Sequence, residues 1–490
     1  MNRFFKSLNS VLCILCISIF TSQCFAQSAA ASANADALKS RQYLELINSV
    51  FEYVRINYVD EVDPQVLYEG AMKGIMNALG DPYSSYLDTK QMSSLNDTTG
   101  GNFGGVGLSI SKAAESTPEN PAYVLVASPI EDTPGFKAGI QAGDLIISID
   151  GTDTSTLTMD EVLGHLRGVI GESVSLIVRR GKNMEFPVTL VRALIEVPTV
   201  KYGMIDKTGY IKIIEFTPQT PERVQEALDN FEQEKYTSLI IDLRNNPGGL
   251  LDSASKVADK FIDSGPIVST KSRLTYQNDV YTASSRKTTV KKGIPIIVLI
   301  NRGSASASEI LSGALKDTHL AYLVGERSFG KGSVQQPIPL PNHDGIKITI
   351  AKYYTPSDTN IHGIGIPPDR EVLFPEFSEE EEKIYMELLK SEKISKYVES
   401  HPGMTEAQIA AYAKQLVKEY RLEERLLRRL IRLEVGKTKP AELYDLDFDL
   451  QLNAALDIIK KENFAKLMKN TKTLKQLQEE AEAKVAAEKK

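Results

Sequence analysis

The feature that most constrains the fold is a regular alternation, beginning near Gly209, of short apolar runs with amphipathic segments. The apolar runs have the length of buried strands and lie at residues 210–214, 239–243 and 295–300. Helical segments follow them, at residues 220–231, 250–261 and 306–316. Because strands that alternate with helices assemble into parallel sheets, we expect a largely parallel α/β sheet with helices on its faces.

The rest of the chain divides into further units, since 490 residues correspond to about three domains. Residues 38–98 form a helical region whose periodicity ends at Asp81-Pro82-Tyr83. Residues 100–193 indicate a compact α+β module. Asp150-Gly151 predicts a tight turn within it. The expected strands and helix of this module lie at residues 122–126, 145–149, 174–179 and 159–167.

Composition narrows the class of protein. Hydrophobic residues make up 42 % and charged residues 25 %, which is ordinary for a globular chain. The net charge of −7 disfavours a dedicated nucleic-acid-binding protein. Residues 378–490 are strongly charged and helical. Because acidic residues intervene among the arginines there, we interpret this extension as a solvated or dimer-forming helical region.

The N-terminus has the order of a secretory signal peptide. Arg3 and Lys6 precede an apolar run at residues 11–20, and cleavage is expected after Ala26. This run is about half of the roughly 20 residues that span a bilayer, which disfavours a membrane anchor. We therefore expect an exported protein of the periplasm or cell envelope, membrane-associated if the signal is retained. All 3 cysteines lie in this segment, so the mature chain has no thiol chemistry.

One candidate site is the loop at residues 242–249, at the carboxyl end of an expected strand, where catalytic groups of parallel sheets gather. It ends in Gly248 and Gly249, whose main-chain N–H groups can approach a ligand and face developing negative charge. An ordinary strand-to-helix turn is an equal alternative.

A second candidate is the loop at residues 301–309, where serines stand at an expected helix N-terminus. A hydroxyl there can act as a nucleophile beside a dipole that favours an oxyanion. Ser304, Ser306 and Ser308 alternate, so their chemistry leaves the nucleophile open. Ser306 with Glu309 also fits a capping box.

The third candidate, at residues 328–336, holds Lys331 between two glycines, which allow the backbone to bury an amine. A phosphate-binding loop is disfavoured, because Gly332 stands where Ser or Thr should hold a metal and Pro337 discourages the following helix. The 5 histidines form no Ser-His-Asp arrangement, and His362 is the best spare candidate for a base. No spacing predicts a metal site.

These motifs also carry a family resemblance. They read GSASASE at residues 303–309, FGKG and VQ within residues 329–335, and LRNNPGG at residues 243–249. Together they resemble the carboxyl-terminal processing proteases, also called tail-specific proteases. The similarity runs from Asp81-Pro82-Tyr83-Ser84 to residues 363–369, and the glycine-rich module resembles a PDZ domain. The implied fold is a multidomain α/β serine-protease core with an inserted PDZ domain and helical terminal regions.

The resemblance implies a serine endopeptidase with a Ser/Lys dyad. Ser306 would be the nucleophile, Lys331 the general base and Gln335 the residue that orients the lysine. Chemistry agrees, because an amine takes the serine proton only when it is neutral, and burial lowers a lysine pKa from about 10.4 to roughly 7 or 8.

The resemblance further implies an oxyanion hole made by the N–H groups of Gly249 and Ala307, with Gly248 as the alternative to Gly249. Asp317 resembles an acidic position associated with the family's activity, and we expect it to cap a helix or form a salt bridge. Asp358 stands where the family has glycine, which affects the geometry of its loop alone.

In the PDZ-like module, Gly105-Val106-Gly107-Leu108 resembles the loop that captures a terminal carboxylate, with the peptide added as a strand. The implied partners are protein substrates with exposed apolar C-termini and an activating adaptor. A second copy of the chain is also implied, in a homodimer through residues 38–79 or the C-terminal helices. Arg167 falls where the family has an arginine that couples the PDZ domain to the active site. No cofactor is implied.

Two other functions stay open. A catalytically inactive PDZ-type adaptor would only bind tails, but it has no reason to keep Ser306, Lys331 and Gln335 together. An acyl-CoA-type enzyme on a related scaffold needs no attached tail-binding module.

Overall fold

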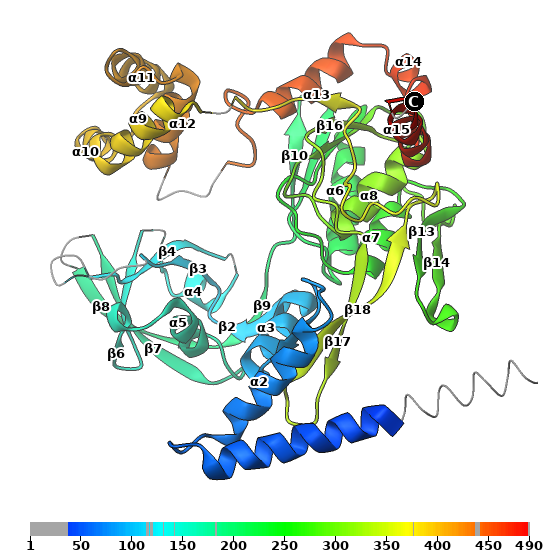
Figure 1. The fold of residues 1–490 in the computed structure, drawn as a ribbon. Helices are drawn as coiled ribbons and strands as arrows, with labels where there is room; N and C mark the ends of the chain where they lie inside the picture. The colour runs from blue at the N-terminus through cyan, green and yellow to red at the C-terminus, as the bar shows by residue number, and fades with distance from the viewer. Residues whose placement is uncertain are drawn as a thin grey trace, which may run out of the picture.

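The computed structural model describes residues 38–488, apart from residues 114–116, 118–120, 131, 142, 182–183, 376 and 437–441. The expected signal peptide lies outside the described residues. Figure 1 shows N-terminal helices in blue, a β-rich module in cyan, an α/β core in green and yellow, and a helical bundle in orange. None of the helices in the described ranges is long and apolar enough to cross a bilayer.

The core is built around a six-stranded sheet in the order β10-β11-β12-β15-β16-β19. Strands β11 to β19 run parallel, whereas the edge strand β10 is antiparallel to β11. This confirms the largely parallel sheet that the sequence predicts. The strands are β10 (Val200–Ile205), β11 (Thr208–Ile213), β12 (Ser238–Asp242), β15 (Ile296–Ile300), β16 (Tyr322–Gly325) and β19 (Arg370–Glu371).

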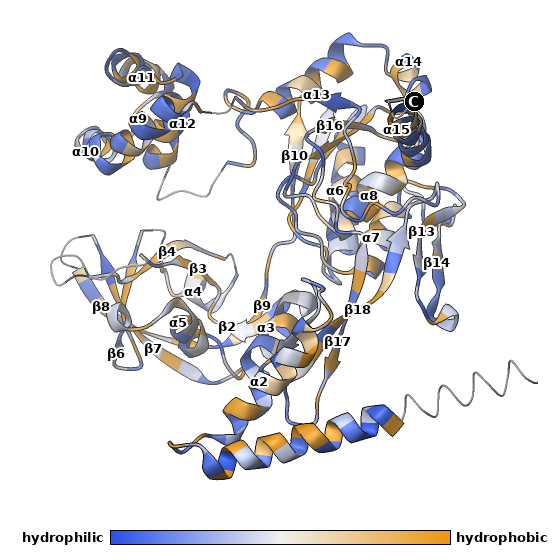
Figure 2. Cartoon of the chain, in the orientation of Figure 1, coloured by the Kyte–Doolittle hydropathy of each residue, from blue (hydrophilic) through white to orange (hydrophobic). Residues whose placement is uncertain are grey.

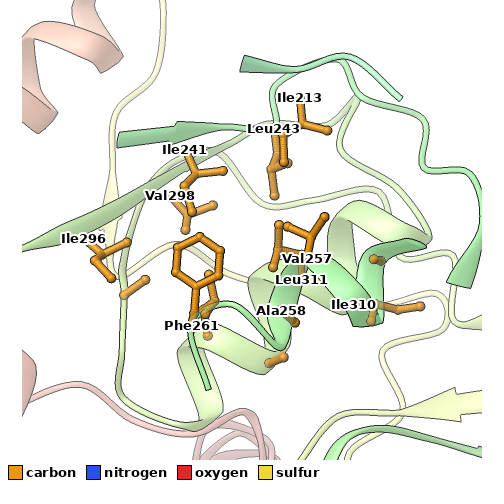
Figure 3. Packing of buried hydrophobic residues seen from close by; sticks show 14 of the residues in the cluster. Ile213, Ile241, Leu243, Val257, Ala258, Phe261, Ile296, Val298, Ile310 and Leu311 are labelled. Atoms are coloured by element: carbon orange, nitrogen blue, oxygen red, sulfur yellow. The ribbon is translucent and has the colours of Figure 1, made fainter. Parts of the chain in front are cut away.

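Three helices cover one face of this sheet: α6 (Thr220–Gln233), α7 (Leu251–Ala258) and α8 (Ala307–Asp317). Their apolar side chains and those of the strands form one cluster, part of which is shown in Figure 3. The spacing of Val224, Leu228 and Phe231 predicts that they face the core, and all three are buried. The sequence predicts Thr220 as the N-cap of this helix, before Pro221 in its first turn, but the N-cap of α6 is Gln219. The Thr220 hydroxyl instead accepts the N–H of Thr217 at 2.9 Å.

The other face of the sheet is covered by helices of the C-terminal extension. Apolar residues of α13 (Leu450–Lys461) pack on those of the central strands, together with α14 (Phe464–Lys469). The extension is therefore not one solvated or dimer-forming region, because its last part completes the core. The contacting residues include Leu452, Ala455, Leu456 and Ile458 on the helix and Tyr210, Ile240, Ile297 and Leu299 on the strands.

A second, antiparallel sheet joins the N-terminal region to the core. Its order is β1-β18-β13-β14, and β17 also pairs with β18. Strand β1 lies within the region that the sequence predicts as helical, and it pairs with β18 from Ser85 opposite Lys347. The strands are β1 (Ser85–Leu87), β13 (Pro266–Lys271), β14 (Asp279–Thr282), β17 (Ser333–Pro339) and β18 (Gly345–Tyr354).

The β-rich module has its own sheet and its own apolar cluster. The sheet order is β3-β4-β5-β7-β8, and β6 (Thr152–Asp153) pairs with β5. The predicted turn is confirmed, since Asp150 and Gly151 take positive φ angles of 47° and 82° between β5 and β6. The other elements are β3 (Leu108–Ser111), β4 (Val124–Pro129), α4 (Pro134–Lys137), β5 (Leu145–Ile149), α5 (Met159–Leu166), β7 (Ser173–Arg180) and β8 (Met184–Val191). A two-stranded ribbon of β2 (Asn102–Gly105) and β9 (Ala193–Glu196) forms the base of the module.

The N-terminal region begins with a helix at residues 38–57, followed by α2 (Pro64–Asn77) and α3 (Thr89–Gly100). The Asp63 side chain caps α2 by accepting the Gln65 N–H. Many apolar side chains of the first helix are exposed, and Figure 2 shows them along its length.

The first part of the C-terminal extension forms a helical bundle with an apolar cluster of its own. Its charged surface and amphipathic helices agree with the sequence prediction. The helices are α9 (Glu379–Lys390), α10 (Lys393–Ser400), α11 (Glu406–Tyr420) and α12 (Glu424–Val435). After α14, α15 (Leu474–Glu488) begins with Leu474, which is buried in the cluster of the first sheet face.

Candidate active site

The three candidate loops meet at the carboxyl edge of the central sheet, because they follow the neighbouring strands β12, β15 and β16. The Ser304 hydroxyl donates to the carbonyl of Leu243 at 2.8 Å, which joins the second loop to the first. The Phe329 N–H donates to the carbonyl of Ser304 at 3.0 Å, which joins the third loop to the second. Residues that are distant in sequence therefore share one site.

Ser306 differs from the two serines beside it. Ser304 and Ser308 are fully buried, and their hydroxyls donate to main-chain carbonyls. Ser306 is partly exposed and has φ 53° and ψ −113°, a conformation that costs a non-glycine residue about 1–3 kcal/mol. Such strain persists where the surroundings enforce it, most often at functional sites. The geometry therefore singles out Ser306 among the three.

Glu309 connects the serine loop to the lysine loop. One oxygen of its buried carboxylate, Oε2, accepts the N–H groups of Ser306 at 2.9 Å and Lys331 at 2.8 Å. The other oxygen accepts the Gly330 N–H at 2.7 Å and the Ser328 hydroxyl. Burial raises the pKa of Glu309, although these hydrogen bonds act in the opposite direction. The predicted capping box is present, but the carboxylate does more than cap the helix.

Lys331 is half-buried between Gly330 and Gly332. The glycines are required by close packing, since a Cβ on Gly332 would lie 2.7 Å from the N atom of His362. Burial lowers the pKa of Lys331, the positive charge of Lys347 lowers it further, and Glu309 raises it. Within the described part of the chain, the Lys331 amine makes no hydrogen bond to the Ser306 hydroxyl.

Two main-chain N–H groups near Ser306 have no hydrogen-bond acceptor among the described residues. One belongs to Ala307, in the first turn of α8, and the other to the exposed Gly249. The Gly248 N–H is committed to the Asn246 side chain at 2.8 Å. A Cβ on Gly248 would lie 2.8 Å from the Cβ of Ser306, so the two loops touch at this glycine. The geometry therefore favours Gly249 over Gly248 as a donor.

Gln335 lies on β17, where its side-chain amide donates to the Ser333 hydroxyl at 2.9 Å and the Thr349 hydroxyl at 3.3 Å. No contact joins it to Lys331 in the described ranges, so these two predicted partners are not brought together.

The spare candidate His362 is exposed. Residues 38–488, where described, contain no group of three or more acidic, histidine or cysteine side chains able to hold a metal ion.

Asp317 joins three segments, as expected for a capping residue. Its carboxylate accepts the N–H groups of Ser357 at 3.0 Å and of Leu474 at 2.7 Å, and also the Thr355 hydroxyl. Asp358, the departure from the family pattern, takes a left-handed φ of 61° and pairs with Lys271. Its loop therefore keeps a conformation that glycine would favour.

The segment Asp81-Pro82-Tyr83-Ser84, directly before β1, also contacts this site, although the sequence predicts only a turn that ends a helix there. The Tyr83 ring lies over the Lys331 amine, with 5.2 Å between the amine and the ring centroid. The Asp81 carboxylate accepts the Tyr83 N–H at 3.0 Å. In the sequence this segment is marked only by the motif Asp81-Pro82-Tyr83-Ser84. Nothing in that motif indicates that Tyr83 contacts Lys331.

In the β-rich module, Gly105 ends β2, and Val106 and Gly107 connect it to the edge strand β3, which begins at Leu108. Gly107 has a φ of 75°, and a Cβ there would overlap the Thr133 side chain. Because β3 pairs with β4 alone in the described sheet, its other edge can accept an added strand.

Arg167 follows α5 at the base of this module. It forms an ion pair with Asp97 of α3 at 3.3 Å, and its guanidinium stacks on Phe103 at 4.3 Å from the ring centroid. It thus contacts the connection between the module and the N-terminal region rather than Ser306 or Lys331.

Comparisons with known proteins agree with this arrangement. Residues 207–372 match peptidase family S41, residues 125–180 match the PDZ domain, and residues 15–91 match the activating protease CtpB N-terminal domain. The chain is 44 % identical over 331 residues to a carboxy-terminal-processing protease of Bartonella bacilliformis, covering 66 % of this chain and 74 % of that protein.

Other known proteins are also similar to this chain. The chain is 33 % identical to the carboxy-terminal processing protease CtpB of Bacillus subtilis, covering 72 % of each protein. Among solved structures, the photosystem II D1 C-terminal processing protease matches with a TM-score of 0.41 and 27 % identity, covering 67 % of this chain and 92 % of that one.

Proposed function

Because this chain belongs to the carboxy-terminal-processing proteases of peptidase family S41, and is thus a serine peptidase with a PDZ domain, we propose that it cleaves protein substrates with a Ser306/Lys331 dyad. The observation that carries the proposal is the shared Glu309 oxygen, which holds the N–H groups of both residues. The strained, partly exposed conformation of Ser306 and the lowered pKa of Lys331 support the same roles.

In the proposed mechanism, the neutral amine of Lys331 takes the proton of the Ser306 hydroxyl as its oxygen attacks the substrate carbonyl. The N–H groups of Ala307 and Gly249 receive the negative charge on the carbonyl oxygen, at about 3 kcal/mol per donor in comparable sites. The lysine then gives its proton to the leaving amine, and water releases the acyl group by the reverse steps. Gln335, which the resemblance implies orients the lysine, takes no part in these steps, because its amide donates to the Ser333 and Thr349 hydroxyls.

We further propose that the PDZ domain selects substrates by an exposed, mostly apolar C-terminal tail. The tail would add to the free edge of β3, and the Gly105-Val106-Gly107-Leu108 loop would bind its carboxylate. Arg167 would transmit tail binding to the N-terminal region through its ion pair with Asp97. An activating adaptor would act on the same coupling.

The dyad is tested by Ser306→Ala and Lys331→Ala, with products of a tailed substrate located by mass spectrometry. Both variants should lose cleavage, while Lys352→Ala, an exposed lysine on β18, should retain it. Full activity of either alanine variant would refute the dyad. An inactive wild-type protein that still binds the tail would support the alternative function, a PDZ-type adaptor.

Tail recognition is tested with one substrate in two forms, one with a free C-terminal carboxylate and one with an amidated C-terminus. Because the amide removes the charge that the loop would bind, it should be cleaved more slowly, mainly through a higher KM. Equal kcat/KM for the two forms would remove the proposed role of the loop.

We also propose export to the periplasm or cell envelope, because the first 26 residues have the n-region, apolar run and cleavage site of a signal peptide.

For assembly we propose a homodimer through the helix at residues 38–57. An apolar groove between this helix and α2 supports it, lined by Leu46, Ile47, Val50, Phe51, Val54, Leu67 and Ala71. Sedimentation of Val50→Glu should show monomers, with Glu45→Lys on the same helix as the control that stays dimeric.

A further inference from the structure

We infer that Tyr83 is a positioning residue of the active site, whose ring covers the Lys331 amine and limits its contact with water. The inference rests on the proposed function, in which Lys331 is the general base. Tyr83 lies about 250 residues before Lys331 in the chain, so the N-terminal region would supply part of the environment of the base.

The ring is held in place from several directions. The Asp81 carboxylate accepts the Tyr83 N–H at 3.0 Å and the Ser84 hydroxyl at 2.6 Å. The Ser84 oxygen in turn accepts the Thr349 N–H of β18 at 3.0 Å. The ring also meets the His362 ring edge-on, with 6.1 Å between ring centroids. Strand β1, which follows directly, pairs with β18 and fixes the segment on the core.

Two opposing effects of the ring on Lys331 have to be weighed. The electron-rich face of a tyrosine attracts an ammonium group, which favours the charged form. The same ring takes the place of water, which favours the neutral form. At 5.2 Å the amine lies toward the outer part of the range of such attraction, whereas burial is the largest influence on the lysine. We therefore assign the ring a net effect that favours the neutral amine.

The other charged and titratable groups around Lys331 do not explain this burial. Lys347 on β18 opposes the ammonium, and Glu309 on α8 favours it. His362 and Asp81 lie against Tyr83 rather than against the amine. The Tyr83 ring is thus the apolar group that covers the Lys331 amine, and a single substitution at Tyr83 can remove it.

The test is the pH dependence of kcat/KM on a tailed substrate, from about pH 6 to about pH 10, for Tyr83→Ala, Tyr83→Leu and Tyr83→Phe. Tyr83→Ala should move the rising limb to higher pH by about one unit, which lowers the rate near neutral pH roughly tenfold. Tyr83→Phe should match the wild type. Tyr83→Leu keeps an apolar cover without the π face, so its limb should not move to higher pH.

His362→Gln removes the histidine that packs against the Tyr83 ring and should leave the rising limb in place. An unchanged or lowered midpoint in Tyr83→Ala, at a Tm equal to that of Tyr83→Phe, would overturn the inference, as would a raised midpoint in Tyr83→Leu. If Tyr83→Ala does not fold, Tyr83→Val replaces it with the same expected direction. A cleaving Lys331→Ala variant would instead refute the dyad, so the two failures are distinguishable.

Discussion

The Glu309 carboxylate fixes the distance between the loops of the proposed nucleophile and base. Its two oxygens accept four hydrogen bonds, three of them from the main-chain N–H groups of Ser306, Gly330 and Lys331. A carboxylate suits this position because both of its oxygens are acceptors, whereas an amide has one acceptor and one donor group.

Glu309→Gln should therefore lower both kcat/KM and stability. In either orientation the amide NH2 would face main-chain N–H groups and leave them without an acceptor, at a cost of about 2 kcal/mol or more. Steady-state kinetics and urea unfolding measure the two effects. Glu371→Gln, an exposed carboxylate on β19, is the matched control and should change neither. Wild-type kinetics in Glu309→Gln would contradict the role of this residue.

Lys331 should show a conflict between activity and stability. Its folded pKa lies below the ordinary value of 10.5, because burial disfavours the ammonium. At pH values between the folded pKa and the unfolded pKa, Lys331 is protonated in the unfolded chain and neutral in the folded chain. The free energy of unfolding therefore rises with pH across that window. Lys331→Met removes the amine and should unfold at a higher temperature than the wild type at neutral pH, while losing activity.

The measurement is the thermal unfolding of both proteins across the pH range. The advantage of Lys331→Met should shrink as pH rises toward 10.5. An advantage that does not depend on pH would come from packing alone and would contradict this account.

At the scale of elements, α13 holds the loop that carries Gly249. Arg244 of this loop forms a bidentate pair with Asp449, the N-cap of α13, with both distances at 2.7 Å. The same guanidinium also pairs with the fully buried Asp242. A helix from the far end of the chain thus fixes a loop of the candidate active site.

Asp449→Asn should weaken this connection strongly. Arg244 keeps Asp242 as a partner, so the loss is that of charge-assisted hydrogen bonds, about 2 kcal/mol, and the loop should lose the geometry that the proposed oxyanion hole needs. The control is Asp206→Asn, which breaks the exposed pair between Asp206 and Lys460 of the same helix. It should change stability by no more than about 0.5 kcal/mol. Equal effects of the two variants on Tm and kcat would rule out a specific role for Asp449.

At the scale of the whole molecule, the C-terminal extension has two parts with different roles. The bundle α9 to α12 has its own apolar cluster, whereas α13 and α14 cover the second face of the central sheet. The chain enters and leaves the bundle at neighbouring points, since the rings of Phe374 and Phe448 stack at 5.7 Å between centroids.

A chain that ends at Phe377 should therefore be insoluble or strongly destabilised, because it exposes the apolar face of β12 and β15. Replacing residues 379–436 by a short Gly-Ser linker should leave a folded core that still cleaves an unstructured tailed substrate. Soluble yield, thermal unfolding and cleavage rate compare the two. A stable, active chain ending at Phe377 would contradict the role of α13.

The sequence by itself determined the features that depend on neighbouring residues. Apolar periodicity predicted the parallel strands and their helices, Asp150-Gly151 predicted its turn, and the serine and lysine motifs marked loops that meet at one edge of the sheet. These are local because a strand, a turn or a helix face is defined within a few residues.

Only the tertiary structure decided which distant groups meet. Tyr83 over Lys331, Glu309 between two loops, and α13 on the open face of the sheet each join segments separated by many residues. An amphipathic pattern shows that a helix has an apolar face, but the surface it covers depends on the packing of the whole chain. The sequence predicted a boundary at residue 378, but not that α13 and α14 of the extension beyond it pack on the central sheet.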